Sequence, residues 1–371
     1  MDTSTLNSPV LLAACDCLTP FGDANATHAA LVRGERALQL VPVLGGEGGD
    51  PVPLALLPGR ALDETNPPAW LHSLQTMLAP VAGPGWGTAR RPVCVTSSNF
   101  GVGSLYAFRR TGEQAHAAHG TAHGSVELVR RALGWGENVA IFSHACVSAH
   151  LGLIHAARLL AEGAADEALV VSYDFLSPFV TGGFHALKIL NADFPAPYQD
   201  RATGSIGLGD GAGYAVLSRQ RGDLALAAHS LHNEMHHFTA NRPDGAGFAA
   251  ALAPLVAAAA GCRLWVKGHG TGTLEAGRLE VAALARAFPG APLVGWKGSL
   301  GHTLGSCGLV ELAIVAASLR AGCTPGTVGS ASPTFVDTVA LAPFANAAFD
   351  GVICASNAFG GAHAALLLSH A

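Results

Sequence analysis

The sequence predicts an α/β protein with buried β-sheets, and three features of the chain support this fold class. Short apolar runs bounded by turn residues alternate with longer Ala- and Leu-rich segments, a pattern typical of strands joined by helices. Hydrophobic residues make up 50% of the 371 residues, which is ample material for a core. Charged residues make up 13%, about half of the usual share, so we expect surface to be hidden by close packing or by a subunit interface.

The short apolar runs are expected to be buried strands. They lie between turn residues and are shorter than typical helices. Runs that are apolar throughout indicate sheets covered on both faces. In chain order they are Val10–Ala14, Val93–Thr96, Ala168–Ser172, Gly213–Leu217, Leu264–Val266 and Val352–Ala355.

The longer segments between these runs are expected to be helices. Several of them end at a glycine, the residue that most readily adopts the left-handed conformation that closes a helix. Gly163, Gly261 and Gly322 stand at such positions. The expected helices are Asn25–Arg33, Val126–Leu133, Val147–Glu162, Phe248–Ala260, Arg278–Ala287 and Cys307–Arg320.

Two segments rich in proline and glycine, Pro42–Pro58 and Pro80–Pro92, are expected to be surface loops. The length allows two ordinary domains or one large duplicated one. We place a boundary near Gln220, where a strand-like run ends in polar residues. The expected halves are therefore residues 1–220 and 221–371.

The charge and cysteine patterns argue against several classes of protein. The net charge is −5 and the few Lys and Arg are scattered, so a nucleic-acid partner is not expected. The eight cysteines show no CxxC pair and no paired Cys/His spacing, so neither a zinc site nor a disulfide framework is expected. The N-terminus lacks a basic region and no apolar stretch reaches about 18 residues, so we expect no membrane span and a cytoplasmic location.

Cys146 is a candidate nucleophile. It follows the apolar run Val139–Phe142 and precedes the long helix expected at Val147–Glu162, which places it at a strand-to-helix turn. The free N–H groups at a helix N-terminus favour a thiolate and can donate hydrogen bonds to an oxyanion. Taken alone, a cysteine between alanine and valine is more often a packing residue.

Two histidines in glycine-rich turns strengthen this hypothesis. His269 follows the apolar run Leu264–Val266 in the sequence KGHGTGT, where glycines let the backbone approach a ligand closely. His302 lies in a second glycine-rich turn before a helix, five positions after Lys297. Although single surface histidines are common, two at such junctions indicate a functional site.

At these residues the chain resembles the β-ketoacyl-acyl carrier protein synthases, a family of the thiolase-like superfamily. The family's motifs occur in the family's order along nearly the whole chain, beginning with a TPxG-like turn at residues 18–22. The further motifs are Ala-Cys at 145–146, GLGDGAG at 207–213, HGTGT at 269–273, KGSLGHTLGSCG at 297–308 and FGG at 359–361.

The resemblance implies a thiolase-like fold, with two similar βαβαβαββ halves in five layers, αβαβα. It places the nucleophile in the half 1–220 and both histidines in the half 221–371. Members of the family typically form tight dimers, here a homodimer or a heterodimer with a second ketosynthase-like subunit. The cysteine accepts an acyl group from the phosphopantetheine of an acyl carrier protein, and no metal or redox cofactor is needed.

The resemblance also implies roles for individual residues. Cys146 would carry the acyl group, while His269 and His302 promote decarboxylation of a malonyl thioester and stabilise the enolate oxygen. The backbone N–H groups of Cys146 and Phe359 would form the oxyanion hole. Lys297 matches the family's lysine in the site's charge network, and its alternative is a structural ion pair with Glu280 or Glu311.

Further positions are assigned to the substrate by the same resemblance. Thr239, Thr271 and Thr273 stand where family members contact the pantetheine arm, although each can equally be a loop cap. Phe359, flanked by glycines, is predicted to be a movable gate over Cys146, and its alternative is an ordinary core aromatic.

The chain departs from the family pattern at several positions. Gly277 stands in place of the usual aspartate, Asp210 in place of a glutamate and Ser299 in place of a frequent asparagine. The usual phenylalanine-rich stretch before FGG contains Asn357 here. These changes bear on substrate choice within type II fatty acid, polyketide or aryl-polyene synthesis. The alternatives to a condensing synthase are a non-condensing partner subunit of the chain-length-factor kind and a thiolase acting on coenzyme A thioesters.

Overall fold

Ten strands form one hydrogen-bonded sheet in the computed structural model, which describes residues 5–46, 48–64 and 68–371. The strand order is β11-β10-β14-β15-β9-β1-β8-β6-β4-β5. The strands of the first half are β1 (Thr5–Leu18), β4 (Val93–Thr96), β5 (Val139–Phe142), β6 (Glu167–Asp174) and β8 (Gly211–Ser218). Those of the second half are β9 (Leu224–Asn233), β10 (Leu264–Lys267), β11 (Leu293–Val294), β14 (Gly351–Ala358) and β15 (Ala362–His370).

The same strand order occurs twice. If the five strands of each half are numbered in chain order, both halves have the same arrangement. From the middle of the sheet outward, the strands lie in the order first, fifth, fourth, second, third. The two first strands, β1 and β9, pair antiparallel and so join the halves. The chain passes from one half to the other in the exposed turn at 219–223, between β8 and β9.

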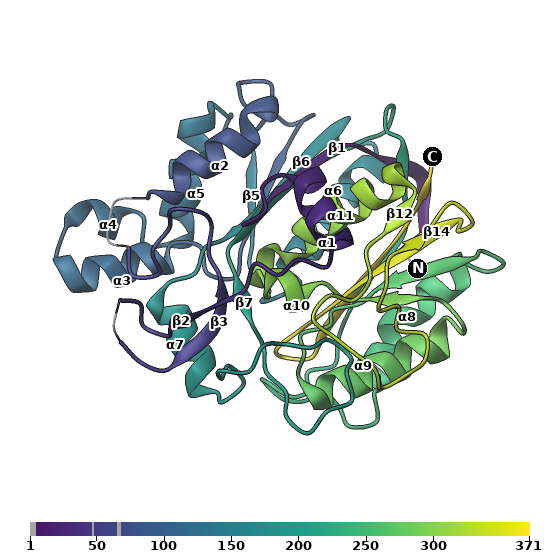
Figure 1. The fold of residues 1–371 in the computed structure, drawn as a ribbon. Helices are drawn as coiled ribbons and strands as arrows, with labels where there is room; N and C mark the ends of the chain where they lie inside the picture. Colours follow the sequence, from purple (N-terminus) through teal and green to yellow (C-terminus); the bar gives the residue numbers. More distant parts are fainter. Residues whose placement is uncertain (1–4, 47, 65–67) are drawn as a thin grey trace.

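Helices lie in three layers around the two halves of the sheet (Figure 1). The inner layer is α6 (Ser148–Ala161) and α11 (Cys307–Ala321), whose side chains form a core with both halves. One outer layer is α2 (Trp70–Leu78) and α5 (Ala122–Leu133), and the other is α8 (Ala246–Ala258) and α9 (Leu274–Ala287). The expected αβαβα layering is therefore confirmed.

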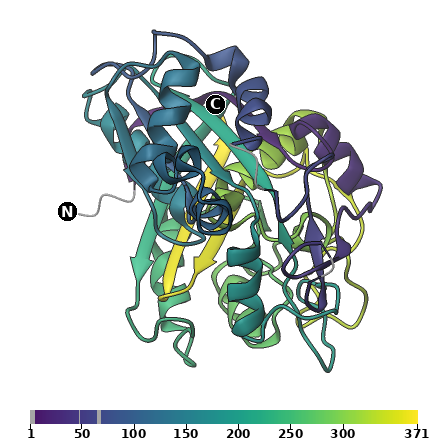
Figure 2. The same cartoon turned by 90° about the vertical axis from the view of Figure 1, so that its left-hand side faces the viewer.

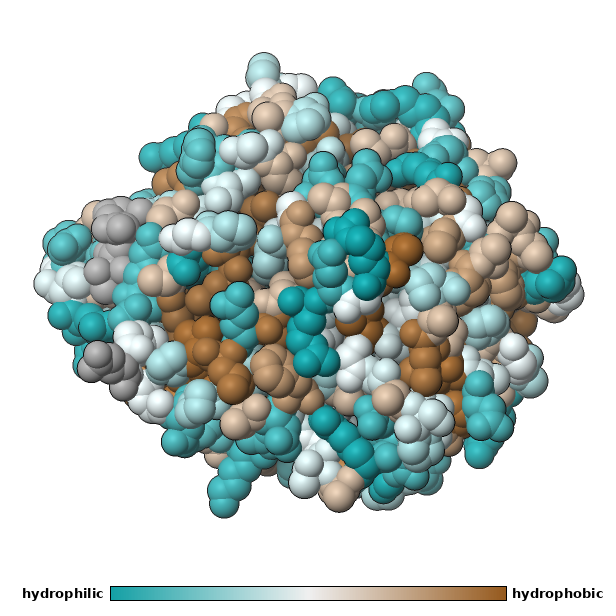
Figure 3. Space-filling model, viewed as in Figure 1, coloured by the Kyte–Doolittle hydropathy of each residue, from teal (hydrophilic) through white to brown (hydrophobic). Residues whose placement is uncertain are grey.

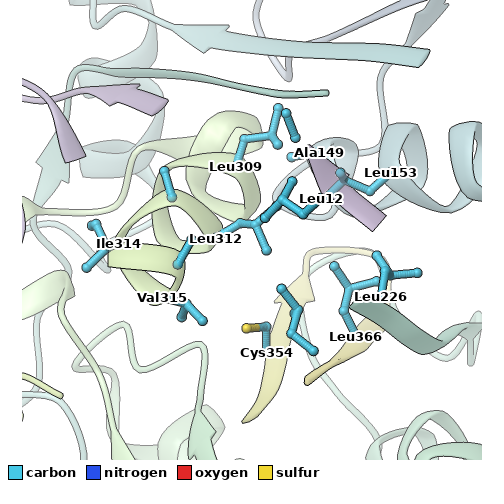
Figure 4. Close-up of a cluster of buried hydrophobic side chains, with 14 of the residues drawn as sticks. Leu12, Ala149, Leu153, Leu226, Leu309, Leu312, Ile314, Val315, Cys354 and Leu366 are labelled. Carbon is cyan, nitrogen blue, oxygen red and sulfur yellow. The ribbon is translucent and has the colours of Figure 1, made fainter. Parts of the chain in front are cut away.

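The inner core is entirely apolar in the part shown in Figure 4. Leu309, Leu312 and Val315 of α11 face Leu12 of β1 and the strands of the second half, including Leu366. α11 is covered on all sides, and apolar residues occupy most of its circumference, with Glu311 as a buried charge among them. The segment Leu304–Ala321 is apolar and long enough to cross a membrane, but 89% of it is buried inside the protein, as in a core helix.

Shorter helices and strands complete the fold. Figure 2 shows the short helices of the first half in front, with the yellow strands of the second half behind them. These elements are α1 (Ala24–Val32), α3 (Val102–Thr111), α4 (Gln114–Ala118), α7 (Pro178–Ala186), α10 (Lys297–Leu300), and the 3₁₀ turns Ala79–Val81 and Leu304–Ser306. Short strands are β2 (Gln39–Pro42), β3 (Pro51–Ala55), β7 (Leu208–Gly209), β12 (Cys323–Thr324) and β13 (Phe344–Ala345).

All six expected strands and all six expected helices are present, several of them longer than predicted. The prediction of a loop throughout Pro42–Pro58 is wrong, because Pro51–Ala55 forms β3 and Val52, Leu54 and Ala55 are buried. The pairing of β3 with β7 begins at Leu54, beyond both prolines, so their missing N–H groups interrupt no bond of that ladder. The segment Pro80–Pro92 is largely loop, as predicted.

Apolar side chains also lie on the surface. Figure 3 shows them gathered over the region of β2, β3 and α7, where Leu40, Leu44 and Phe179 are exposed. At the end of the sheet, the edge strand β5 exposes Ile141. These exposed groups agree with the low charge of the chain, which predicts that some surface is covered by another subunit.

Candidate active site

Cys146 lies in the tight turn between β5 and α6. Ala145 adopts a φ of 44°, which is uncommon for a residue with a side chain and marks a sharp reversal of the backbone. Ser148 holds this turn: its Oγ accepts from the His144 N–H at 2.8 Å and donates to the Ala145 carbonyl at 2.6 Å. Cys146 is buried at the beginning of α6, as the sequence predicts, so the N–H groups of the first turn lie beside it.

His302 contacts the sulfur directly. Its Nε2 lies 3.0 Å from Cys146 Sγ, while its Nδ1 accepts a hydrogen bond from the Leu304 N–H at 3.2 Å. Since Nδ1 is an acceptor, the neutral ring carries its proton on Nε2 and donates it toward the sulfur. The backbone of His302 is fixed by Gly207 and Gly209 of the GLGDGAG motif, through bonds of 2.7 and 3.0 Å.

His269 stands beside His302 at the end of β10. The two rings are 4.9 Å apart at their centroids and nearly perpendicular. Ser356 Oγ lies 3.2 Å from His269 Nδ1, and Glu280 accepts hydrogen bonds from the backbone N–H groups of His269 and Gly270. Cys146 Sγ and one ring nitrogen of each histidine all lie within 4.8 Å of one another, so three distant segments converge on one point.

Burial determines the charge state of these groups. It lowers the pKa of His269 and His302 well below the ordinary value, and the neighbouring Lys297 lowers both further. Both rings are therefore neutral near pH 7 and act as N–H donors. Burial raises the pKa of the Cys146 thiol, while Lys297 acts in the opposite direction. The donors aimed at the sulfur must supply the remaining stabilisation of a thiolate.

Lys297 belongs to a buried charge network behind His269. Its Nζ donates to the His269 carbonyl at 2.7 Å and to Glu311 at 2.6 Å. Lys267 pairs with the other oxygen of Glu311, and all three side chains are almost completely buried. Of the two ion pairs considered for Lys297, the one with Glu311 is observed. Burial lowers the pKa of Lys297, but Glu311 more than compensates, so the net direction is upward and the lysine remains charged.

A pocket opens from these residues to the surface. The threonines assigned to the substrate arm, Thr239, Thr271 and Thr273, all line it, and Thr271 and Thr273 are joined through their hydroxyls at 2.9 Å. Lys297 is behind the pocket and does not line it. The remaining lining residues are Cys146, Phe184, Ile189, Ile206, Asn241, His269, Ala276, Glu280, His302, Asn357, Ala358 and Phe359.

Phe359 lies at the mouth of this pocket. Its side chain is 37% exposed, more than expected of a core aromatic, and its ring stacks on Phe184 at 5.9 Å. Gly360 and Gly361, with φ of 85° and 73°, follow it in a turn that residues with side chains rarely adopt. A second hollow continues outward from Phe359 and Thr239 and is bordered by Leu187 and Leu279.

Three of the departures from the family pattern, Gly277, Asp210 and Ser299, lie outside the pocket lining, whereas Asn357 lines the pocket. Asp210 is fully buried and accepts bonds from the Leu57 and Leu176 N–H groups and from Arg60. Ser299 Oγ donates to the Glu35 carbonyl at 2.6 Å. Gly277 faces Phe335, whose ring would be 3.3 Å from an added Cβ. Asp210 and Ser299 therefore support the fold around the site.

In the described part of the chain, Cys146, His269 and His302 form a group of side chains whose types can bind a metal ion. A histidine that binds a metal usually donates its second ring N–H to a fixed acceptor. His302 has the opposite arrangement, because its Nδ1 accepts from Leu304. The site therefore favours a proton on Nε2 over a metal ion.

Several residues of the site escaped the sequence reasoning. Lys267 and Ser356 support the histidines, and Phe184 stacks on Phe359. The sequence does contain a signal for Lys267. A lysine at the end of an apolar strand and a glutamate within an apolar helix, here Glu311, each need a buried partner of opposite charge. Ser356 and Phe184 carry no comparable signal.

Comparison with protein families gives matches on both sides of the turn between β8 and β9. Residues 133–222 match the N-terminal domain of β-ketoacyl synthases, and residues 225–330 match their C-terminal domain. Together the two matches cover more than half of the chain.

Two curated relatives illustrate the similarity. The chain is 30% identical to the 3-oxoacyl-[acyl-carrier-protein] synthase 2 of Vibrio cholerae serotype O1, over 62% of this chain and 62% of that protein. It is 29% identical to the ketoacyl synthase alpha subunit of the tetracenomycin polyketide synthase of Streptomyces glaucescens, over 62% of this chain and 60% of that protein. The chain thus matches about three fifths of the length of each relative.

Solved structures share the fold over nearly the whole chain. A β-ketoacyl synthase from Burkholderia phymatum aligns with a TM-score of 0.83 and 20% identity, covering 98% of this chain and 100% of that one. A chain from the complex of a ketosynthase with its chain length factor from Xenorhabdus doucetiae aligns with a TM-score of 0.78 and 22% identity, covering 98% of each. A chain from a complex of a type II acyl carrier protein with its ketosynthase reaches 0.85 at 16% identity, covering 98% and 99%.

Proposed function

The chain belongs to the β-ketoacyl synthase family, and we propose that it joins an acyl group held on Cys146 to the two-carbon unit of a malonyl-acyl carrier protein. The observation that carries this proposal is the contact of 3.0 Å between Cys146 Sγ and His302 Nε2, with the neutral ring of His269 beside it. A nucleophile and two uncharged N–H donors in one buried pocket suit both half-reactions of a decarboxylative Claisen condensation.

The first half-reaction loads the cysteine. The sulfur of Cys146 attacks the carbonyl carbon of an acyl thioester, the bond to the carrier sulfur breaks, and the carrier leaves as a thiol with the proton that Cys146 loses. Negative charge develops on the carbonyl oxygen in the intermediate. The backbone N–H groups of Cys146 and Phe359 are proposed to stabilise it, and both residues line the same pocket.

The second half-reaction forms the carbon–carbon bond. The malonyl thioester loses carbon dioxide, and the electron pair of the broken bond remains as an enolate. Its oxygen is proposed to accept hydrogen bonds from Nε2 of His269 and His302, which, being neutral, donate without transferring a proton. The enolate carbon then attacks the acyl-Cys146 carbonyl, and the Cys146 thiolate leaves.

Two other functions are less well supported. A thiolase would place a second cysteine in the pocket, but Cys307, the cysteine closest in the fold, donates to the Cys146 carbonyl and does not line the pocket. A non-condensing partner subunit has no need for the nucleophile, yet Cys146 is present in contact with His302. We propose that the condensation belongs to the biosynthesis of a fatty acid, a polyketide or an aryl polyene.

Intact-protein mass spectrometry tests the function. After incubation with a panel of acyl carrier protein thioesters, the wild-type protein should gain the mass of one acyl group and, with malonyl-carrier protein, release a β-ketoacyl product. Cys146→Ala should form no adduct while remaining folded, because loss of one sulfur is a small packing change. Cys262→Ala removes an exposed cysteine and should leave the adduct intact. An acyl adduct on Cys146→Ala would refute the nucleophile assignment.

The proposed partners are an acyl carrier protein and a second ketosynthase-like subunit, in a homodimer or a heterodimer, in the cytoplasm. The edge strand β5 supports the dimer, because it exposes Ile141 and leaves unpaired backbone groups beside Cys146. Ile141→Glu should convert a dimer into monomers in analytical ultracentrifugation. Leu341→Glu, with the same exposure of 38% away from β5, is the matched control and should remain dimeric. Equal behaviour of both variants would place the interface elsewhere.

A further inference from the structure

Asn357 is a polar residue in the pocket that the proposed mechanism does not use. It replaces part of a phenylalanine-rich stretch of the family pattern and lies on β14 next to Ser356. Because side chains alternate along a strand, Ser356 faces Cys146 and His269 while Asn357 faces the opposite side. Asn357 lines the pocket, as Thr239 and Asn241 do.

Two buried residues fix the orientation of Asn357. His363, its cross-strand neighbour on β15, places Nδ1 at 3.0 Å from Asn357 Oδ1. The other ring nitrogen of His363 faces Glu234 Oε2 at 3.6 Å, and both of these side chains are 2% exposed. Phe248 covers the His363 ring at a centroid distance of 4.2 Å. One end of the Asn357 amide is thus occupied by His363.

The backbone makes room for this arrangement. A Cβ at Gly247 would lie 2.0 Å from Glu234 Oε2 and 2.7 Å from His363 Nε2, and one at Gly361 would lie 2.3 Å from Glu234 Cγ. Neither position therefore tolerates a side chain while Glu234 and His363 are in place. The fold is therefore built closely around the side chains of Glu234 and His363, whose facing atoms lie in contact at 3.6 Å without a hydrogen bond, while His363 contacts Asn357 directly.

Glu234 also joins the two segments that border the pocket mouth. Its backbone N–H donates to the Gly361 carbonyl at 3.0 Å, which attaches it to the turn that carries Phe359. Its carboxylate accepts from the Arg242 N–H at 2.8 Å, which closes the loop that carries Thr239 and Asn241. Asn357 lines the same pocket as Phe359 of one segment and Thr239 of the other.

The free end of the Asn357 amide has no hydrogen-bond partner among the described residues and borders the pocket. Since His363 occupies Oδ1, the free end is the NH2 group, which donates, and the carbonyl of a secondary amide is a strong neutral acceptor for it. Under the proposed function, the arm that carries the thioester contains such amides, whereas the acyl chain lies beyond Cys146.

We propose that Asn357 is a specificity-determining residue that binds an amide of the substrate's carrier arm, and that His363 and Glu234 are positioning residues that orient it. This inference rests on the proposed function. It predicts that the protein distinguishes thioesters by the presence of the arm, independently of the acyl group.

The test compares two thioesters of the same acyl group, one with pantetheine and one with ethanethiol, in the acylation of Cys146. Asn357→Leu keeps the volume of the side chain and removes its hydrogen bonds. It should raise KM for the pantetheine thioester about 10-fold, as expected for one lost hydrogen bond, with kcat little changed. The rate with the ethyl thioester should be unchanged, since this substrate has no amide.

Variants of His363 separate positioning from folding. His363→Ala should reproduce the KM effect of Asn357→Leu, and His363→Asn, whose amide can replace Nδ1, should restore most of the wild-type value. His229→Ala is the matched control, since it removes a buried histidine from the neighbouring strand β9 without contact to Asn357, and should not change KM. Thermal melts establish that each variant is folded.

The outcomes are distinguishable. If Asn357→Leu changes the kinetics of both thioesters equally, or of neither, Asn357 does not bind the arm and the inference is overturned while the proposed function stands. If His229→Ala has the same effect as His363→Ala, the positioning role is overturned. If the wild-type protein is acylated by neither thioester nor by any carrier protein, the proposed function fails and the inference fails with it.

Discussion

The three side chains proposed to react, Cys146, His269 and His302, are held largely through their backbones. The turn of Cys146 is fixed by Ser148, that of His302 by Gly207, and that of His269 by Glu280. The distances between the side chains therefore depend on how three separate loops meet, while Leu304 and Ser356 orient the two histidine rings. A substitution of one ring should leave the others in place, so single variants can report single roles.

We expect different losses for the two histidines. His302→Ala removes the donor in contact with the sulfur and should slow acylation, whereas His269→Ala should leave acylation largely intact. Both should lower malonyl decarboxylation roughly 10²–10³-fold, because each removes a donor from the enolate oxygen. Single-turnover acylation and release of carbon dioxide measure the two steps separately. Unchanged decarboxylation in both variants would refute the paired role.

Much of the site could be predicted at the residue level because chemistry and spacing are both visible in the sequence. A cysteine before a long helix and two histidines in glycine-rich turns indicate the reacting groups. The partner of Lys297 could be narrowed only to Glu280 or Glu311, since the choice depends on which side chain of α9 or α11 faces the lysine. The contact of Ser356 with His269 depends on strand register and has no sequence pattern.

At the level of elements, the turn after β14 carries Phe359, an exposed residue of the pocket lining. It ends in two glycines with positive φ, and Phe359 lies on Phe184 of α7 rather than in the core. This arrangement suits a ring that moves away when the second substrate enters.

Phe359→Ala tests the gate. We expect slower condensation with more hydrolysis of the acyl-cysteine or more malonyl decarboxylation without acylation, because no ring closes the pocket. If Phe359 were a core aromatic, its replacement by alanine would instead lower the free energy of unfolding by about 3–5 kcal/mol, and activity would fall as the protein unfolds. Product ratios and thermal melts are measured together. Phe179→Ala, which removes an exposed ring of α7 outside the pocket lining, should match the wild type. An early melt with an unchanged product ratio would exclude the gate.

Long apolar elements were easier to predict than short or mixed ones. The buried helix α11 and the strand β4 stand out by composition alone. The strands β9 and β15 were missed because alanine, histidine and serine interrupt their apolar residues, although both lie in the middle of the sheet. β3 was missed because its prolines favour a loop, and its strand pairing with β2 and β7 overrides that preference.

At the scale of the whole molecule, the duplicated strand order brings the site to the seam between the halves. Cys146 begins α6 in the first half, and His302 lies just before α11 in the second, so the two inner helices start close to one another. The layering was expected from the resemblance to the family. The individual sequences of the two halves show no repeat, because the same strand positions can be filled by many apolar residues.

Buried histidines should make the fold sensitive to acid. Burial lowers the pKa of His150 to about 3 and of His229 to about 4, and it also lowers those of His269 and His302. Below pH ~6.5 the histidines of the unfolded chain bind protons, whereas the same histidines in the folded protein stay neutral. The stability that comes from these buried neutral histidines is therefore lost as the pH falls from that value. For His150, whose folded pKa is about 3, the loss of stability is up to about 2 kcal/mol at pH 5.

Asp174 acts in the opposite direction. Burial raises its pKa to about 6, so the stability that comes from its protonation is present at low pH and is lost as the pH rises through that value. Burial raises the pKa of Asp210 and Glu280 in the same way. Six histidines with lowered pKa values outweigh these three carboxyls, so the melting temperature should fall between pH 7.5 and pH 5; they are His150, His155, His229, His269, His302 and His363. His150→Gln should reduce this dependence. A melting temperature that stays constant or rises on acidification would contradict the argument.

The position of α11 between the two halves has a consequence for synthesis of the chain. α6 ends at Ala161 and its apolar face is covered by a helix that ends at Ala321, 160 residues later. At ribosomal rates of about 5–20 residues per second, the emerging first half waits roughly 10–30 s with that face open to water. A nascent chain of this design depends on chaperones during the interval, and expression of the first half alone would yield aggregates rather than a soluble domain.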